Sequence, residues 1–110
     1  IYAGGSGNVL TGGAGNDAMN GGADNDVFVF SAGFGSDTIT AFDADPAAGG
    51  QDLLDISALG INALNFAASV TITDLGANTR VSIGADTILL LGVNGTAPDI
   101  ITVQDFLLAA

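Results

Sequence analysis

The feature that most constrains this chain is a nine-residue unit that repeats near its start. Residues 12–20 read GGAGNDAMN, and residues 21–29 follow directly as GGADNDVFV. Residues 32–40, AGFGSDTIT, come after an insertion of Phe30 and Ser31, whereas residues 4–11, GGSGNVLT, are one residue short and lack the Asp. Such a repeat favours a solenoid, because each unit buries its apolar side only by stacking on its neighbours.

Each unit combines a turn with a very short strand. The first six residues are rich in Gly, which adopts positive φ and lets another backbone approach closely. The last three residues predict a strand with one large apolar side chain pointing inward. One unit makes half a coil, so loops two units apart lie on the same side, and the apolar residues stack between two thin parallel sheets. These apolar residues are Leu10, Met19, Phe28 and Ile39.

The charge of the chain indicates a cation. All 12 acidic residues are Asp, Arg80 is the single basic residue, and the formal net charge is −11. Self-repulsion of this size opposes a compact state. Ca²⁺ takes about 6–8 oxygen ligands, and the short Asp side chain suits a cage that includes the loop backbone. A single Gly-Asn-Asp is also a common hairpin turn, but three units nearly in register favour Ca²⁺.

Composition argues against several other functions. The chain has neither Cys nor His, which excludes a disulfide framework, a thiolate or His-ligated metal site and a Ser–His–Asp triad. The lack of a basic patch disfavours nucleic acid and anionic membranes as partners, and the longest apolar run, 88–93, is too short to cross a bilayer. We therefore expect no enzymatic activity, no nucleic-acid binding and no membrane insertion in these residues.

The units resemble the haemolysin-type calcium-binding repeats of the RTX (repeats-in-toxin) family of secreted bacterial proteins. The pattern they share is G-G-x-G-x-D-x-U-x, where U is a large apolar residue, and residues 35–59 resemble the segment with which that family leaves its repeats. The resemblance implies an all-β fold, in which a parallel β-roll (a β-solenoid) over residues 1–45 is followed by a small antiparallel β cap over 46–110. The two parts are expected to form one continuous unit.

The resemblance also implies ligands for one to three Ca²⁺ ions. In the family, an earlier loop gives its second and fourth carbonyls, a later loop gives its first and third, and each adds its Asp. The best-supported site is then Gly13, Gly15 and Asp17 with Ala32, Phe34 and Asp37. A second site pairs Gly5 and Gly7 with Gly21, Ala23 and Asp26. It is expected to be weak, because Val9 stands where the Asp belongs, although the amide oxygen of Asn8 could substitute.

A third site would combine Gly22, Asp24 and Asp26 with an acid beyond the repeats. The family's Asp at this point is Ala41 here, so another acid must serve. Asp52 is favoured and Asp43 comes next, with Asp45 and Asp55 as further candidates. Asp45 precedes Pro46, a pair that is also typical of a plain turn.

The second half of the chain has strand patterns in place of the repeat. Strands are expected at 69–73, 80–83 and 87–92, joined by turns at 74–79 and 84–86, as a meander that caps the coil. Residues 56–66 predict a loop or a short helix. Residues 99–110 predict a last strand or short helix that buries Phe106, Leu107 and Leu108.

The family resemblance also extends to export. Its members leave the cell through type I secretion machinery, guided by an uncleaved C-terminal segment, and residues 105–110 are similar to such a signal. The opening IYAGG reads like the tail of an earlier repeat, so we expect the C-terminal piece of a larger secreted protein, whose remainder could be an enzyme or an adhesin. The expected function is a module that folds on extracellular Ca²⁺. The alternative is a structural or adhesive module of a bacterial surface layer or extracellular filament, with self-association.

Overall fold

The computed structural model describes residues 7–22, 25–40, 42, 52–93 and 101–109. Most of their regular structure is β-strand with little helix, which confirms the all-β class. None of the helices among these residues has the length and apolar character needed to cross a membrane. The strands are β1 (Val9–Thr11), β2 (Ala18–Asn20), β3 (Val27–Val29), β4 (Ser36–Thr40), β5 (Leu53–Asp55), β6 (Val70–Asp74), β7 (Thr79–Ile83), β8 (Asp86–Leu90) and β9 (Phe106–Leu107). The helices are η1 (Ser57–Leu59), α1 (Phe66–Ser69) and η2 (Val103–Asp105).

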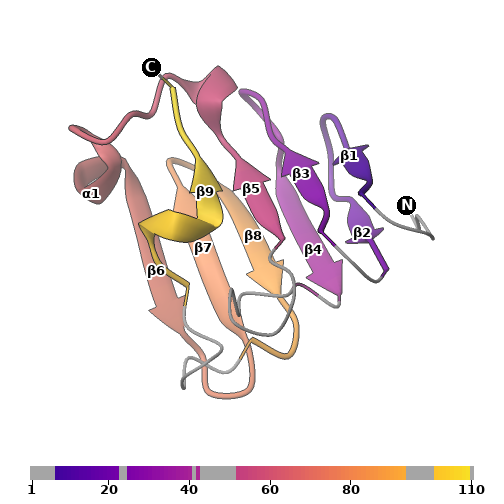
Figure 1. The fold of residues 1–110 in the computed structure, drawn as a ribbon. Helices are drawn as coiled ribbons and strands as arrows, with labels where there is room; N and C mark the ends of the chain where they lie inside the picture. Colours follow the sequence, from indigo (N-terminus) through magenta and orange to yellow (C-terminus); the bar gives the residue numbers. More distant parts are fainter. Residues whose placement is uncertain (1–6, 23–24, 41, 43–51, 94–100, 110) are drawn as a thin grey trace.

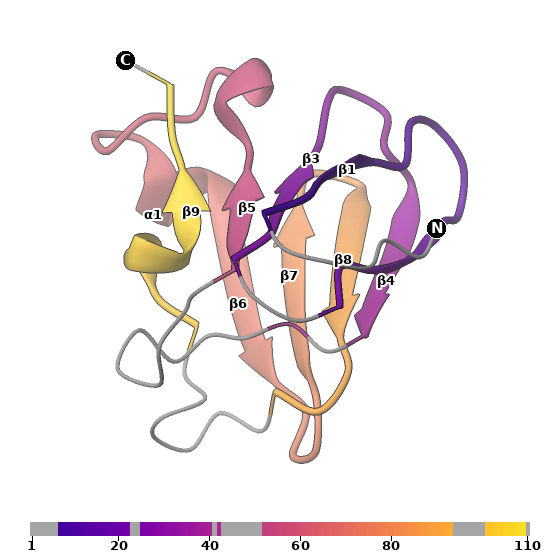
Figure 2. The same ribbon diagram turned by 45° about the vertical axis from the view of Figure 1, so that its right-hand side comes forward.

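The strands form two facing sheets, and the first four strands alternate between them (Figures 1 and 2). One sheet has the order β1-β3-β5-β9 and the other β2-β4-β8-β7-β6. Pairing is parallel throughout the first sheet and between β2, β4 and β8 in the second. The chain thus crosses from one layer to the other between successive strands from β1 to β4.

The strand register shows how the two-residue insertion is absorbed. Val9 pairs with Val27, eighteen residues later, which is the length of two units. Ala18 pairs with Thr38, twenty residues later, because Phe30 and Ser31 lie between them. Phe30 is only 1% exposed and packs edge-on against Phe34, with ring centroids 5.0 Å apart. The insertion therefore adds an aromatic side chain to the core without breaking the alignment of the repeat strands.

The apolar residue of each repeat lies in the core between the sheets. Leu10, Met19, Phe28 and Ile39 are at most 3% exposed, as predicted. Burying a side chain of this size contributes about 1.5–3 kcal/mol. Leu54, Ile88 and Phe106 continue the same core beyond the repeats. One row of single apolar residues thus joins the coil to the second half of the chain.

The predicted meander is present as β6, β7 and β8, which pair antiparallel. Ile88 and Leu90 on β8 are fully buried, in keeping with the alternation of a half-buried strand. β8 also pairs in parallel with β4, where Ser36 lies opposite Thr87, fifty-one residues later. The meander is therefore joined edge to edge with the repeat sheet.

The C-terminal segment supplies the last strand of the other sheet. β9 pairs with β5, and Phe106 is 6% exposed, as expected. Burial of Leu107 was a wrong prediction, because successive strand residues face opposite sides and Leu107 is 38% exposed. Residues 56–66 contain the short helix η1 and the start of α1. The expected boundary at residues 45 and 46 lies outside the described residues.

Candidate cation-binding loops

The loops at residues 12–17 and 32–37 lie against each other where the chain enters β2 and β4. The backbone N–H of Asp17 donates to Oδ1 of Asp37 at 2.9 Å, and the N–H of Thr38 donates to the carbonyl of Asp17 at 2.8 Å. A Cβ atom added to Gly35 would stand 2.5 Å from the carbonyl oxygen of Gly15. The two loops of the best-supported predicted site are therefore in direct backbone contact.

The carboxylate of Asp17 is folded back into its own loop. Its Oδ2 atom is buried and has no hydrogen-bond partner within the described part of the chain. Gly12 makes room for it, since a Cβ atom there would stand 2.7 Å from this oxygen. A buried carboxylate oxygen without a donor is costly. A cation therefore fits this position, because it would satisfy the oxygen without needing a proton donor.

The same arrangement occurs on the other sheet at Asp26, which is fully buried. Its Oδ1 accepts a hydrogen bond from the N–H of Asn8 at 3.0 Å. Its Oδ2 is buried without a hydrogen-bond partner among the described residues, and it packs where a Cβ on Gly21 would clash. Asp26 in turn donates its own N–H to Oδ1 of Asp52 at 2.8 Å, so the favoured acid of the third predicted site does reach Asp26.

A common rule joins Asp37, Asp26 and Asp52: the Oδ1 of each accepts an N–H from the loop stacked next to it. The bonds from Asp17 to Asp37, Asn8 to Asp26 and Asp26 to Asp52 follow it. Asp86 extends the rule into the meander, since its Oδ1 accepts the N–H of Gly35 at 3.2 Å. The sequence predicts Asp86 only as part of a connecting turn, and its contact with Gly35 was not predicted. The signal that could have found it is the sequence Gly-x-Asp-Thr-Ile, which begins at both Gly35 and Gly84.

Burial and neighbouring charges act on Asp37, which is 2% exposed. Burial raises the pKa of its carboxyl above the ordinary value of 3.8, and the negative charges of Asp17 and Asp86 raise it further. The hydrogen bond from the N–H of Asp17 works in the opposite direction. A carboxylate that is desolvated and faces two like charges favours a positive charge beside it, either a proton or a metal cation.

The remaining predicted ligands divide into three groups. Gly13 and Ala32 lie in the stacked loops and are exposed, whereas the side chain of Phe34 is buried, so only its backbone carbonyl is a possible ligand there. Gly22 donates its N–H to Oδ1 of Asn20 at 2.8 Å. Gly5, Ala23, Asp24, Asp43 and Asp45 lie outside the described residues.

Two further observations bear on the second site and on the number of acids. The amide nitrogen of Asn8 donates to the carbonyl of Gly21 at 3.2 Å, so its nitrogen rather than its oxygen faces the later loop. Within the described residues, no three acidic side chains gather closely enough to hold a metal ion by themselves. Backbone carbonyls would therefore have to supply part of any cage.

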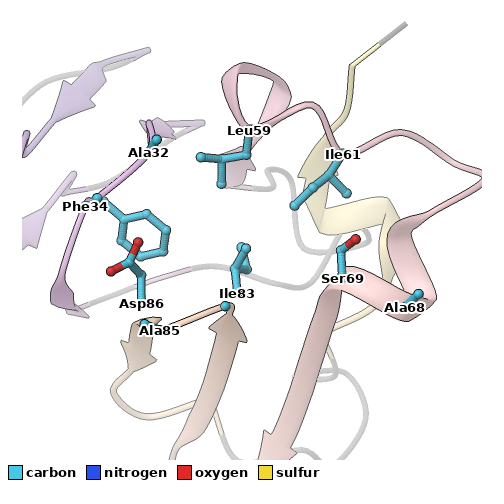
Figure 3. Close-up of a pocket in the computed structure, with 11 residues that line it drawn as sticks. Ala32, Phe34, Leu59, Ile61, Ala68, Ser69, Ile83, Ala85 and Asp86 are labelled. Carbon is cyan, nitrogen blue, oxygen red and sulfur yellow. The ribbon is translucent and has the colours of Figure 1, made fainter.

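A pocket of about 510 Å³ lies beside the loop at residues 32–34, on the side of the meander (Figure 3). Leu59 and Ile61 face Ile83 across it, and Asp86 lies next to Phe34 at one end. Its labelled walls are mostly apolar, with polar groups from Asp86 and Ser69. The pocket shows that Asp86 is reachable from this side as well as from the loop that it contacts.

Comparison with solved structures supports the fold. The extracellular lipase LipA from Serratia marcescens matches 98% of this chain at 22% identity with a TM-score of 0.50, and the chain spans only 21% of the lipase's length. The AlgE6R3 subunit of the mannuronan C5-epimerase from Azotobacter vinelandii matches 99% of this chain and 72% of its own at 26% identity, but its TM-score of 0.36 adds no argument. No protein-family model and no curated protein matches the chain. At these identities, the comparison shows a shared fold with part of the lipase.

Proposed function

We propose that this chain is a Ca²⁺-binding module of the RTX type, which folds in extracellular Ca²⁺ and supports the type I secretion and stability of a larger secreted protein. The observation that carries the proposal is a pair of buried carboxylate oxygens, Oδ2 of Asp17 and Oδ2 of Asp26. Neither has a hydrogen-bond partner among the residues that the structure describes. Each lies over the first Gly of its own unit, on a different sheet. The Oδ2 atom of the Asp is therefore buried without a hydrogen-bond partner in two sequence-equivalent loops of the described structure.

The residues that would hold the ion follow from the stacked loops. On one side these are the carboxylates of Asp17 and Asp37 with the carbonyls of Gly13, Gly15, Ala32 and Phe34. On the other side Asp26 and Asp52 would contribute. The ion supplies two positive charges when bound. The chain itself supplies desolvated carboxylates and a backbone cage, both of which are assembled only when the strands pair.

The charge of the chain makes folding conditional on the cation. With a net charge of −11, the carboxylates repel one another, and those of Asp26, Asp37 and Asp52 are almost completely removed from water on folding. Extracellular Ca²⁺ modules bind with Kd values of about 10⁻⁴ to 10⁻³ M. At one hundred times Kd, each site contributes about 2.7 kcal/mol. Low intracellular Ca²⁺ would thus leave the folded state only marginally stable, so that the chain unfolds readily for export, and the extracellular ion would stabilise the fold.

A titration followed by circular dichroism tests this function. The chain is first placed in chelator, and Ca²⁺ is then added while the β signal and the thermal midpoint are recorded, with Mg²⁺ as the control. We expect Ca²⁺ to raise both at millimolar concentration, and Mg²⁺ to do so weakly because it keeps its water and demands a smaller octahedral cage. Equal responses to the two ions, or none to Ca²⁺, would refute the proposal.

The exposed edge of the second sheet favours a second candidate function. β6 is the end strand of that sheet in the described structure, and Thr71 and Asp74 on it are exposed. An edge strand of this kind can pair with another chain, as a structural or adhesive module at a cell surface would require. Light scattering in Ca²⁺ separates the two candidates, because ordered polymers support the second and a compact monomer supports the first.

A further inference from the structure

We propose that Asn16, Ser36 and Thr87 form an uncharged hydrogen-bonded column that sets the spacing of the adjacent acids, with Asn16 as a positioning residue of the cation site. The inference rests on the proposed function. None of the three residues is among the predicted ligands. Each is the immediate neighbour in sequence of an acid on the same edge: Asn16 precedes Asp17, Ser36 precedes Asp37, and Thr87 follows Asp86.

The contacts run without a break from the first loop to the meander. Oδ1 of Asn16 accepts the backbone N–H of Ser36 at 3.1 Å. The hydroxyl of Thr87 donates to the hydroxyl oxygen of Ser36 at 3.2 Å. The backbone N–H of Thr87 also donates to the carbonyl of Gly35 at 2.9 Å. Side chains therefore link three segments that are distant in sequence, at the level where the acids stack.

The column acts against a force that the acids themselves create. Asp17, Asp37 and Asp86 interact as like charges, and that repulsion pushes their segments apart when no cation is present. Hydrogen bonds between neutral groups are not reversed by this repulsion, so they hold the segments at a fixed separation. The column thereby prepares the spacing between the carbonyls of the two loops before an ion arrives.

On the opposite edge, the residue before the Asp position of a unit also makes a hydrogen bond between stacked loops. Asn8 stands directly before the site of the missing Asp, as Asn16 stands before Asp17. Its amide nitrogen donates to the carbonyl of Gly21 at 3.2 Å, so it too links a loop to the one stacked on it. A cross-loop bond from the side chain at this position therefore occurs on both edges, with a different partner on each.

Fixed loop spacing has a measurable consequence in the choice of ion. Ca²⁺ binds oxygen at about 2.3–2.6 Å and Mg²⁺ at about 2.0–2.1 Å, and a rigid cage discriminates between them more strongly than a soft one. Removal of a group that orients ligands typically costs about 10–100-fold in metal affinity. We expect Asn16→Ala to raise the Kd for Ca²⁺ about tenfold while changing the Kd for Mg²⁺ much less. The Kd for Mg²⁺ divided by the Kd for Ca²⁺ should therefore fall.

The experiment compares Asn16→Ala with Asn78→Ala in the full chain, by calorimetric titration with Ca²⁺ and with Mg²⁺. Asn78 is a matched control, because its Oδ1 accepts the N–H of Gly92 at 2.9 Å, a bond of the same type in the meander. Both variants are expected to melt at a lower temperature in chelator. Only Asn16→Ala is expected to lower the ratio of Mg²⁺ to Ca²⁺ dissociation constants.

A second variant covers the case in which Asn16→Ala fails to fold. Thr87→Val keeps the shape of the side chain and removes the hydroxyl that bonds Ser36, so it should shift the ion ratio in the same direction by a smaller factor. The positioning role is overturned if Asn16→Ala and Thr87→Val, where they fold, show the same ratio of Mg²⁺ to Ca²⁺ dissociation constants as Asn78→Ala. A wild-type chain that binds no Ca²⁺ overturns the proposed function and this inference together, which distinguishes the two failures.

Discussion

Oδ1 of Asp37 accepts the backbone N–H of Asp17 across 2.9 Å, which joins two loops that are twenty residues apart. Asp26 uses its Oδ1 in the same way toward Asn8, while its Oδ2 is buried without a partner within the described residues. The two oxygens of such a carboxylate therefore have separate roles. One oxygen helps to hold the coil together, and the other creates the requirement for a cation.

Asp37 combines the same Oδ1 contact with a carboxylate that is only 2% exposed, which predicts that Asp37→Asn has effects of opposite sign with and without Ca²⁺. The Asn side chain keeps an oxygen for the N–H of Asp17 but removes a buried charge, so the cation-free chain should become more stable by on the order of 1 kcal/mol. Ca²⁺ affinity should fall at least tenfold, because a charged ligand is lost. Urea unfolding in chelator and calorimetric titration measure the two effects.

Asp74→Asn is the control for this prediction. Asp74 is exposed, and its Oδ1 accepts the N–H of Gly76 at 2.9 Å in the turn after β6, so the bond type is the same and the cation site is distant. It should change stability by less than about 0.5 kcal/mol in either condition. Destabilisation by Asp37→Asn in chelator, or unchanged Ca²⁺ affinity, would contradict the role given to the buried charge of Asp37.

The small size of Gly12 is predicted to matter only because of Asp17. A Cβ at Gly12 would stand 2.7 Å from Oδ2 of Asp17, so Gly12→Ala should push the carboxylate out of the loop and cost about 1–3 kcal/mol. In an Asp17→Gly background no side-chain atom of residue 17 remains to clash, and the same substitution should be nearly neutral. A double-mutant cycle from urea unfolding in Ca²⁺ measures this coupling, and additive costs would count against it.

The raised pKa of Asp37 predicts how the cation-free chain responds to pH. The folded state binds more protons than the unfolded state between the ordinary pKa of 3.8 and the higher folded value. The contribution of Asp37 to stability is therefore full below pH 3.8 and is lost as the pH rises through the folded pKa. Urea unfolding in chelator across this window should show that loss in the wild-type chain, and Asp37→Asn should lack it.

Asp86 is predicted to fasten the meander to the repeats. Its Oδ1 accepts the N–H of Gly35, so Asp86→Ala should leave that amide without its acceptor and speed its hydrogen exchange about tenfold. Asp74→Ala, on the far turn of the meander, should leave exchange at Gly35 unchanged. Equal exchange in the two variants would mean that the β4–β8 pairing alone holds this junction.

The repeat determined what could be predicted from the sequence. Met19 and Phe28 fall in the core because a period of nine fixes which residue of each unit points inward, and the insertion at Phe30 leaves that alignment intact. The three meander strands were also predicted, since their alternation and turn residues are local signals. These features need no knowledge of which segments meet.

Contacts that depend on distant pairing could not be predicted in the same way. Asp86 reaches Gly35 only because β8 pairs with β4, fifty-one residues away in the sequence. No local sequence pattern indicates that these two strands are neighbours. Leu107 was placed in the core because residues 106–110 are all apolar, which hides the alternation that turns Leu107 outward. The column of Asn16, Ser36 and Thr87 likewise follows from the register of three segments.

Crystallography of the full chain grown in Ca²⁺, with a lanthanide substituted for its anomalous signal, would locate the ion. We predict a peak between the loops at residues 12–17 and 32–37, within coordination distance of Oδ2 of Asp17. Crystals of the folded chain that contain the ion only at exposed acids such as Asp74, with these loops empty, would contradict the account.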